Sequence, residues 1–221
     1  MSGVQVIAGI ILAAGASSRM GAPKALLKYR GETFLDRLIR IVGHVSRPVI
    51  AVLGYHADQI RAGIKGGAVF AINPNPERGQ LSSLQTGLKE LPPETEGFLF
   101  IPVDCPAVSE ATVIRLANAF ARRGPDTLFV IPRYGDKRGH PVFAARSIAE
   151  EILTLPPDAQ ARDVVHGHVD RTVYIDVNDP GILTDIDDPA AYRELAGSAV
   201  GNGAKDDILP HKANWKQTGD P

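Results

Sequence analysis

The residues best suited to chemistry lie in one loop near the start of the chain. Residues 12–24 read LAAGASSRMGAPK, so a run of small side chains carries one arginine, Arg19, and one lysine, Lys24. Small side chains let backbone N–H groups approach an anion closely, and glycine permits the positive φ that such a turn needs. Because two cations lie in the same loop, the segment predicts a site that holds phosphate groups.

A plain structural turn is the alternative interpretation, because glycine-rich turns after strands are common in α/β proteins. The loop contains neither the dinucleotide fingerprint GxGxxG nor the P-loop motif GxxxxGK[ST]. The missing glycines argue against a redox enzyme with a dinucleotide site.

A second candidate group is acidic. Asp104 directly follows the apolar residues 98–103, which are typical of a strand, and open parallel sheets bind ligands beyond the carboxyl ends of their strands. A carboxylate opposite a phosphate loop repels the substrate unless a cation lies between them. The sequence therefore implies Mg²⁺, with hard oxygen ligands from Asp104 and the phosphates. A helix cap is the alternative for Asp104, but Ser109 is better suited to that role.

The elements that must position these groups alternate between strands and helices. Short β-branched and apolar runs predict strands, and apolar residues at helical spacing predict helices. The expected strands are residues 4–12, 48–53, 68–72, 98–103, 126–132 and 172–177, with an exposed hairpin turn at 133–139. The expected helices are 34–42, capped by Thr33, and 57–62, 81–91, 109–123, 147–153 and 158–168. This alternation predicts an α/β fold with a mostly parallel sheet covered by helices.

The composition sets limits on the class of protein. The 221 residues are 44% hydrophobic and 22% charged, with a formal net charge of −1. We expect one domain over residues 1–197 and a flexible C-terminal tail over 198–221. The near-neutral charge gives no field for nucleic acid, and no stretch reaches the length of a membrane span.

The single cysteine, Cys105, excludes an internal disulfide and is typical of a reducing compartment. We expect it to be a buried small residue without a catalytic role. No lysine or arginine precedes the apolar start, so a cytoplasmic protein is expected and a signal peptide is not.

The phosphate-type loop resembles a known signature. Residues 12–24 are similar to LAAGxSxRMGxPK of the MobA-like nucleotidyltransferases, and within that family to the molybdenum cofactor cytidylyltransferases. Guanylyl-transferring relatives read LAGGxSxRMGxDK, with glycine where this chain has Ala14 and aspartate where it has Pro23. The resemblance therefore favours CTP over GTP. It also implies a single Rossmann-like three-layer domain of the nucleotide-diphospho-sugar transferase type.

Four further segments carry the resemblance, which covers about residues 5–196. Residues 79–88 (GQLSSLQTGL) resemble GxSSSLxxGL, 104–106 match the metal-binding DxP, 139–143 (GHPVF) resemble GHPVxF, and 181–189 (GILTDIDDP) resemble the ending DIDTPED. The last segment departs from the family with Asp188 for threonine and Ala190-Ala191 for an acidic pair. That departure bears on the local helix cap and on the identity of the acceptor.

The resemblance implies a role for each matching residue. Lys24 would contact the charge that develops on the α-phosphoryl oxygens, and Arg19 the leaving β- and γ-phosphates. Asp104 would hold Mg²⁺ or Mn²⁺ together with Asp185 or Asp187, whereas His140 and Asp187 would contact the acceptor. The implied nucleotide-binding residues are Leu12, Ala13, Ala14, Gly15, Ser17, Arg19, Lys24, Gly79, Ser82 and Ser83, with Ser83 against the base.

Simpler structural roles exist for several of these residues. The serines of residues 79–88 would otherwise cap a helix, and His140 would otherwise be a surface residue beside a turn. The carboxylates between Asp176 and Asp188 would otherwise form a solvated turn.

The function that the resemblance implies is transfer of CMP from CTP to molybdopterin that already carries molybdenum, with release of pyrophosphate. A molybdoenzyme or its chaperone is a further candidate partner. Two alternatives remain open, the same chemistry with GTP or with a sugar- or alcohol-phosphate acceptor, and a catalytically silent nucleotide-binding module.

Overall fold

The computed structural model describes residues 6–200, and within them the chain forms one eight-stranded sheet. The sheet is mostly parallel, and its strand order is β10-β7-β9-β6-β1-β4-β5, with β8 paired to β7. The strands are β1 (Ile7–Ala13), β4 (Val49–Leu53), β5 (Val69–Ile72), β6 (Gly97–Pro102), β7 (Phe129–Tyr134), β8 (Lys137–Arg138), β9 (Val142–Ala145) and β10 (Thr172–Asp176). The predicted mostly parallel α/β sheet is thus confirmed.

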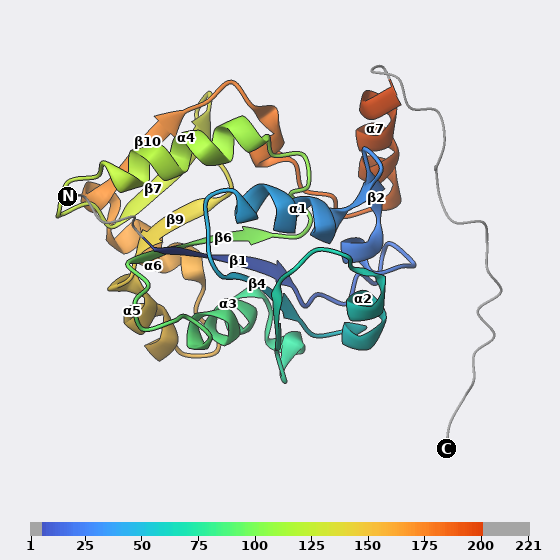
Figure 1. Ribbon diagram of the computed structural model, residues 1–221, viewed down its shortest axis with the longest axis horizontal. Helices are drawn as coiled ribbons and strands as arrows, with labels where there is room; N and C mark the ends of the chain where they lie inside the picture. Colours follow the sequence, from blue (N-terminus) through green and yellow to red (C-terminus); the bar gives the residue numbers. More distant parts are fainter. Residues whose placement is uncertain (1–5, 201–221) are drawn as a thin grey trace.

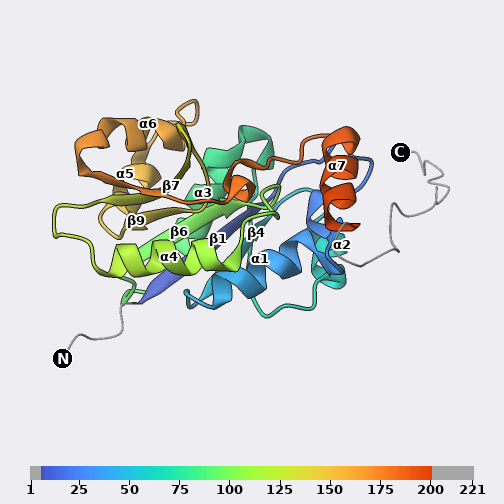
Figure 2. The ribbon, with the colours of Figure 1, turned by 90° about the horizontal axis from the view of Figure 1, so that it is seen from above.

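Helices cover both faces of this sheet (Figures 1 and 2). One face carries α1 (Phe34–Gly43) and α4 (Glu110–Ala121), and the other carries α3 (Gln80–Lys89), α5 (Ile148–Thr154) and α6 (Ala161–Gly167). Because each strand of a parallel sheet is buried on both faces, its residues form near-continuous apolar runs. β1 shows this pattern, since all seven of its residues are buried.

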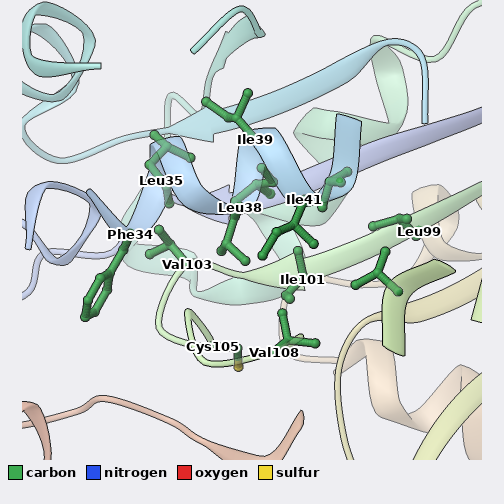
Figure 3. Close-up of a cluster of buried hydrophobic side chains, with 14 of the residues drawn as sticks. Phe34, Leu35, Leu38, Ile39, Ile41, Leu99, Ile101, Val103, Cys105 and Val108 are labelled. Carbon is green, nitrogen blue, oxygen red and sulfur yellow. The ribbon is translucent and has the colours of Figure 1, made fainter. Parts of the chain in front are cut away.

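The core beneath α1 shows how the helical spacing predicted from the sequence is used. Phe34, Leu38 and Ile41 are fully buried, and Figure 3 shows the α1 side chains above Leu99 and Ile101 of β6. The cluster continues past the end of the strand to Val103, Cys105 and Val108. The helix therefore packs on the strand that leads to Asp104 and on the loop that carries it.

The two helix caps expected from the sequence are present. The Thr33 side chain accepts a hydrogen bond from Asp36 N at the start of α1, and the Ser109 side chain accepts one from Thr112 N at the start of α4. Because Ser109 caps α4, the Asp104 carboxylate does not serve as the helix cap.

Strand β9 was not among the expected strands. It lies between β6 and β7 and runs antiparallel to both. Its four residues are all buried, so the sequence shows no polar–apolar alternation there, and such a short apolar run cannot be assigned from periodicity alone. The hairpin predicted at 133–139 is confirmed, because Arg133 pairs with Arg138 across β7 and β8.

Smaller elements complete the described chain. The predicted helix over 158–168 is shorter than expected, because α6 spans Ala161–Gly167. The remaining elements are the hairpin of β2 (Lys28–Tyr29) and β3 (Glu32–Thr33), helix α2 (Ala57–Gly63), the 3-10 helices at Lys24–Leu26, Pro76–Arg78, Val169–Arg171 and Pro180–Leu183, and helix α7 (Pro189–Val200). The predicted tail over 198–221 begins too early, because α7 continues to Val200, and the rest of that tail lies outside the described residues. Among the helices of residues 6–200, none is long and apolar enough to cross a membrane.

The parallel strands bring their following loops to one edge of the sheet. β1, β4, β5 and β6 all run in the same direction, so the segments after Ala13, Leu53, Ile72 and Pro102 meet at the carboxyl edge. Gly54 allows this close meeting, because an added Cβ would lie 2.8 Å from Ala14 O and 2.7 Å from Pro76 Cβ. Tyr55 N also donates to Ala14 O at 3.2 Å, which ties the loops after β1 and β4 together.

Candidate active site

A cleft of about 210 Å³ opens at this carboxyl edge. It brings together nine residues singled out from the sequence: Leu12, Ala13, Ala14, Gly15, Ser17, Lys24, Gly79, Ser83 and Asp104. Gln80, Ala25, Ile60, Pro76, Pro102 and Val103 complete its lining. A second cavity of about 270 Å³, which includes Arg123 and Arg171, lies at the amino ends of β7 and α5 and contains none of the predicted site residues.

The loop after β1 is closed by one serine. Ser17 has φ of 53°, a left-handed conformation, and its Oγ accepts a hydrogen bond from Lys24 N at 3.0 Å. Its carbonyl oxygen accepts another from Met20 N at 2.9 Å. These bonds fold residues 17–24 back on themselves, so Lys24 lines the same cleft as the backbone of Ala14 and Gly15.

The Lys24 ammonium lies between two carboxylates. Its Nζ donates to Asp187 Oδ1 at 2.6 Å and to Asp104 Oδ2 at 3.3 Å. The Lys24 side chain is 13% exposed, and those of Asp104 and Asp187 are 25% and 58% exposed. Burial lowers the pKa of Lys24, but the hydrogen bond to Asp187 and the charges of both carboxylates outweigh burial and raise it above its ordinary 10.5. Lys24 is therefore a cation at neutral pH.

Three carboxylates form a cluster beside this lysine. One oxygen from each of Asp104, Asp185 and Asp187 lies within 4.8 Å of the others. Burial, followed by the charges of Asp104 and Asp187, raises the pKa of Asp185 to about 6 from 3.8. A raised pKa means that a further proton or cation is favoured there, and carboxylate oxygens are the ligands that Mg²⁺ and Mn²⁺ prefer. The residues present thus fit a divalent ion.

A backbone hydrogen bond holds the two acidic segments together. Ile186 N, between Asp185 and Asp187, donates to Asp104 O at 3.0 Å. Asp179 anchors the same late segment, because its Oδ2 accepts from Ser109 N at 2.9 Å and from Thr112 Oγ1 at 2.6 Å. The carboxylates are thus held by the start of α4 and by the loop after β6.

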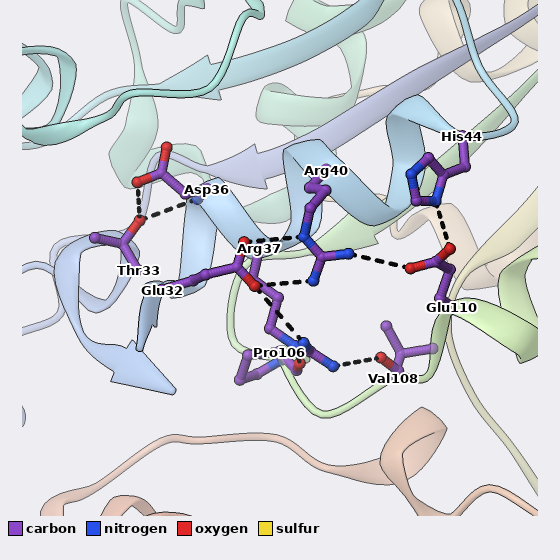
Figure 4. Close-up of polar contacts among 9 residues, drawn as sticks. All are labelled: Glu32, Thr33, Asp36, Arg37, Arg40, His44, Pro106, Val108 and Glu110. Atoms are coloured by element: carbon purple, nitrogen blue, oxygen red, sulfur yellow. Dashed lines mark hydrogen bonds and ion pairs between the residues drawn. The ribbon is translucent and has the colours of Figure 1, made fainter. Parts of the chain in front are cut away.

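Arg37 of α1 supports the loop that carries Asp104 (Figure 4). Its Nε donates to Pro106 O at 2.7 Å and its Nη2 to Val108 O at 3.4 Å. The residue is only 8% exposed, and its guanidinium carbon lies 5.2 Å from the Tyr29 ring centroid. Neighbouring Arg40 instead makes exposed ion pairs with Glu32 and Glu110. Arg37 also lies 3.9 Å from Glu32 in an ion pair, but it is the one of the two arginines that donates hydrogen bonds to the backbone of the Asp104 loop.

The wall formed after β5 is polar but uncharged. Gly79 has φ of 82° and is the N-cap of α3, a conformation that favours glycine. Ser82 and Ser83 follow in the first turn, but their hydroxyls have different environments. Ser83 lines the cleft, whereas the Ser82 Oγ donates to Gly79 O at 2.8 Å and does not line it.

Besides Ser82, Asp185 and Asp187, two other predicted residues lie outside the cleft lining, Arg19 and His140. Arg19 is exposed. The rings of His140 and Phe100 pack edge to face, with their centroids 5.9 Å apart. The His140 Nδ1 is buried and has no hydrogen-bond partner among the described residues. Burial lowers the pKa of His140 to about 4, although the Asp104 charge acts in the opposite direction. His140 is therefore a neutral imidazole packed beside β6, not a surface residue.

Cys105 and Asp188 each have a structural role near the site. Cys105 is buried, as predicted, and burial raises the pKa of its thiol well above its ordinary value. Asp188 Oδ1 accepts hydrogen bonds from Ala190 N and Ala191 N at 2.8 and 2.9 Å. The aspartate that replaces the family's threonine thus still caps the helix that follows.

Two residues near the site, Asn73 and Arg37, were not predicted from the sequence. Asn73 follows β5 as Asp104 follows β6, so the rule that finds polar residues at strand ends applies to both. Arg37 had no such signal, because its contacts with Pro106 and Val108 are 69 and 71 residues distant in the chain.

A mostly parallel sheet with a small-residue loop, a lysine and clustered carboxylates at its carboxyl edge is the arrangement of a nucleotide-binding α/β enzyme. Residues 9–172 match the MobA-like NTP transferase domain. The chain belongs to this family and is thereby a nucleotidyltransferase.

Relatives of known name and structure agree with this assignment. A probable molybdenum cofactor guanylyltransferase of Bacillus cytotoxicus is 30% identical over 154 residues, which are 67% of this chain and 73% of the relative. The crystal structure of Rv0371c from Mycobacterium tuberculosis H37Rv has a TM-score of 0.75 and 30% identity, covering 87% of this chain and 98% of that one. A structure of Rv0371c in complex with manganese has a TM-score of 0.70 and 28% identity, covering 88% of this chain and 100% of that one.

Replacing Arg37 tests its support of the Asp104 loop. Arg37→Met keeps the length and burial of the side chain but leaves two buried carbonyls without their donors. We expect the free energy of unfolding to fall by about 2–3 kcal/mol, as for hydrogen bonds from a charged group. Arg40→Met is the matched control, and loss of its exposed ion pairs should cost at most about 1 kcal/mol. Equal losses in urea denaturation would contradict the proposed support.

The pKa of Asp185 predicts how stability depends on pH without metal. A carboxyl whose pKa is raised by folding stabilises the protein while it is protonated, and that contribution is lost as the pH rises through about 6. We therefore expect Asp185→Asn to raise the melting temperature at pH 8, with the gain vanishing toward pH 4. The measurement is a thermal melt in chelator across this pH range.

Asp188→Asn is the control with the opposite sign. Backbone hydrogen bonds from Ala191 and Ala190 lower the pKa of Asp188, so its loss should lower the melting temperature at pH 8. If the effect of Asp185→Asn did not depend on pH, the surroundings of Asp185 would not be raising the pKa of its carboxyl.

Proposed function

We propose that this enzyme transfers a nucleoside monophosphate from a nucleoside triphosphate to the phosphate of molybdopterin, releasing pyrophosphate. The observation that carries the proposal is the approach of Lys24 and Asp104, 3.3 Å apart, at the mouth of the small-residue loop. Lys24, from the loop after β1, and Asp104, from the loop after the neighbouring strand β6, would then face one bound triphosphate. The names of the curated relatives support molybdopterin as the acceptor.

The chain's own residues would act by positioning and by charge. An acceptor phosphate oxygen attacks the α-phosphorus in line, and the bond to the bridging oxygen breaks, so pyrophosphate leaves with that electron pair. Lys24 would bind the α-phosphoryl oxygens on which negative charge grows, and backbone N–H groups of residues 13–17 would orient the nucleotide. Arg19, which is exposed, would reach the leaving phosphates.

Asp104, Asp185 and Asp187 would hold a divalent ion, Mg²⁺ or Mn²⁺, in this site. When bound, such an ion neutralises charge between carboxylates and phosphates. Lys24 now lies among the same oxygens, so its ammonium would turn toward the phosphates when the nucleotide enters. His140 and Asp187 would face the acceptor.

We further propose CTP as the nucleotide. Ala14 is part of the cleft lining, and glycine at this position, as in guanylyl-transferring sequences, would leave more room for a purine. GTP is the alternative, because the curated relatives are named guanylyltransferases.

The deciding experiment measures pyrophosphate release with each of the four nucleoside triphosphates, Mg²⁺ or Mn²⁺, and a panel of acceptors. We expect release with CTP and molybdenum-loaded molybdopterin. Faster release with GTP would overturn the base assignment, and release only with a sugar or alcohol phosphate would overturn the acceptor. Nucleotide binding without release under any acceptor would indicate a silent nucleotide-binding module.

Replacing Lys24 tests its role in the chemistry. Lys24→Ala should lower turnover about a hundredfold, since one charge-assisted donor to a transition state contributes about 3 kcal/mol. Lys65→Ala, which removes an exposed lysine outside the cleft lining, should leave turnover unchanged. Unaltered turnover in a folded Lys24→Ala protein would remove Lys24 from the mechanism.

A further inference from the structure

Asn73 is a buried amide directly behind the neutral wall of the cleft. It follows β5, is 3% exposed, and contacts the two serines that begin α3. Its Nδ2 donates to Ser82 Oγ at 2.9 Å and to Ser83 Oγ at 3.1 Å. A buried amide with two hydroxyl partners beside a binding cleft controls how those hydroxyls can bond.

The orientation of the Asn73 amide follows from a backbone group. Its Oδ1 accepts a hydrogen bond from Asn75 N at 2.9 Å. A backbone N–H can only donate, so the amide oxygen must face Asn75 and the amide nitrogen must face the serines. Both hydrogens of Nδ2 are then used by the two serine oxygens.

The two hydroxyl hydrogens have different destinations. Ser82 Oγ donates to Gly79 O at 2.8 Å and lies 3.2 Å from Asn75 O, so its hydrogen stays within the loop. Within residues 6–200, the Ser83 hydroxyl accepts a hydrogen bond from Asn73 but donates none to another side chain or to the backbone. Because Ser83 lines the cleft, its hydrogen is available to a ligand there.

The charge distribution in the cleft indicates which part of a nucleotide would meet Ser83. Lys24 and Asp104 lie at the β6 side of β1, whereas Gly79, Gln80 and Ser83 belong to the wall after β5. A triphosphate requires the charged side, so the uncharged base is left for the neutral wall. A serine hydroxyl usually both donates and accepts, but one whose oxygen already receives an amide N–H is biased toward donating.

We propose that Asn73 is a specificity-determining positioning residue, which sets the Ser83 hydroxyl as a donor to an acceptor atom of the nucleobase. This inference rests on the proposed function, since it requires a nucleoside triphosphate in the cleft. It gives the base site a defined polarity: a ring nitrogen or carbonyl oxygen is favoured at this point, and a ring N–H or amino group is disfavoured.

Asn73→Asp tests this polarity with almost no change of shape. One carboxylate oxygen still accepts from Asn75 N, but the other accepts from the serine hydroxyls, so Ser83 presents its oxygen to the base. Equilibrium titration with CTP in Mg²⁺, without acceptor, should show binding about tenfold weaker, as for a lost hydrogen bond and opposed acceptors. Binding of inorganic tripolyphosphate, which has no base, should be unchanged.

A double-mutant cycle separates positioning from mere structural support. Ser83→Ala should weaken CTP binding about fivefold, and adding Asn73→Asp to Ser83→Ala should have no further effect. Thr86→Ala, which removes a hydroxyl bonded to Ser82 O on the same helix, is the control and should leave binding unchanged. Asn73→Ser, which removes the amide donors without adding a charge, serves if Asn73→Asp does not fold.

The outcomes decide the inference separately from the function. A loss that persists at full size in the Ser83→Ala background, an equal loss for tripolyphosphate, or no loss for CTP would each overturn the role of Asn73. If the wild-type protein releases pyrophosphate normally, such a result leaves the proposed function intact. If the wild-type protein binds no nucleoside triphosphate, both proposals fail together.

Discussion

The site must hold three carboxylates close together although they repel one another. One oxygen from each of Asp104, Asp185 and Asp187 lies within 4.8 Å of the others. Like charges at this distance are costly unless a cation lies among them. Two features of the structure reflect that cost: the Lys24 ammonium bonded to Asp104 and Asp187, and the raised pKa of Asp185. The fold must supply enough rigid support to keep these groups together.

That support comes from backbone, not from the acidic side chains themselves. β6 brings Asp104 to the carboxyl edge, Arg37 holds the following loop through two carbonyl oxygens, and Ile186 N binds the Asp104 carbonyl. On the opposite wall Asn73 orders two serines through side-chain hydrogen bonds. These buried, hydrogen-bonded groups therefore fix where the polar side chains of the site lie.

The sequence predicted those parts of the site that depend on local rules. The loop of residues 12–24 and Asp104 were found because each directly follows an apolar strand, and parallel strands bring such ends together. Thr33 and Ser109 were found as caps for a similarly local reason. The resemblance located Asp185 and Asp187, which no spacing rule would have connected to Asp104 at a distance of more than 80 residues.

The parts that escaped prediction depend on tertiary contacts. β9 is too short and too uniformly buried to show a period, and Arg37 reaches a loop far along the chain. Ser82 and Ser83 are chemically identical neighbours, so only the folded structure reveals that one bonds within its own loop while the other lines the cleft. The resemblance had singled out Ser83, but the hydrogen bonds that distinguish the two hydroxyls are visible only in the folded structure.

The ion pair of Lys24 with Asp187 spans 163 residues of chain, and this separation has a consequence for biosynthesis. A ribosome delivers the loop and the first four strands of the parallel core long before residue 187 emerges. Until then the lysine has only Asp104 as a partner, and the acidic cluster is incomplete. Bringing together two residues so far apart in the sequence also has an entropic cost, and such long-range contacts slow folding. The carboxylate cluster is thus among the last parts of the molecule to form, and a polypeptide truncated before residue 185 would lack two of its three carboxylates.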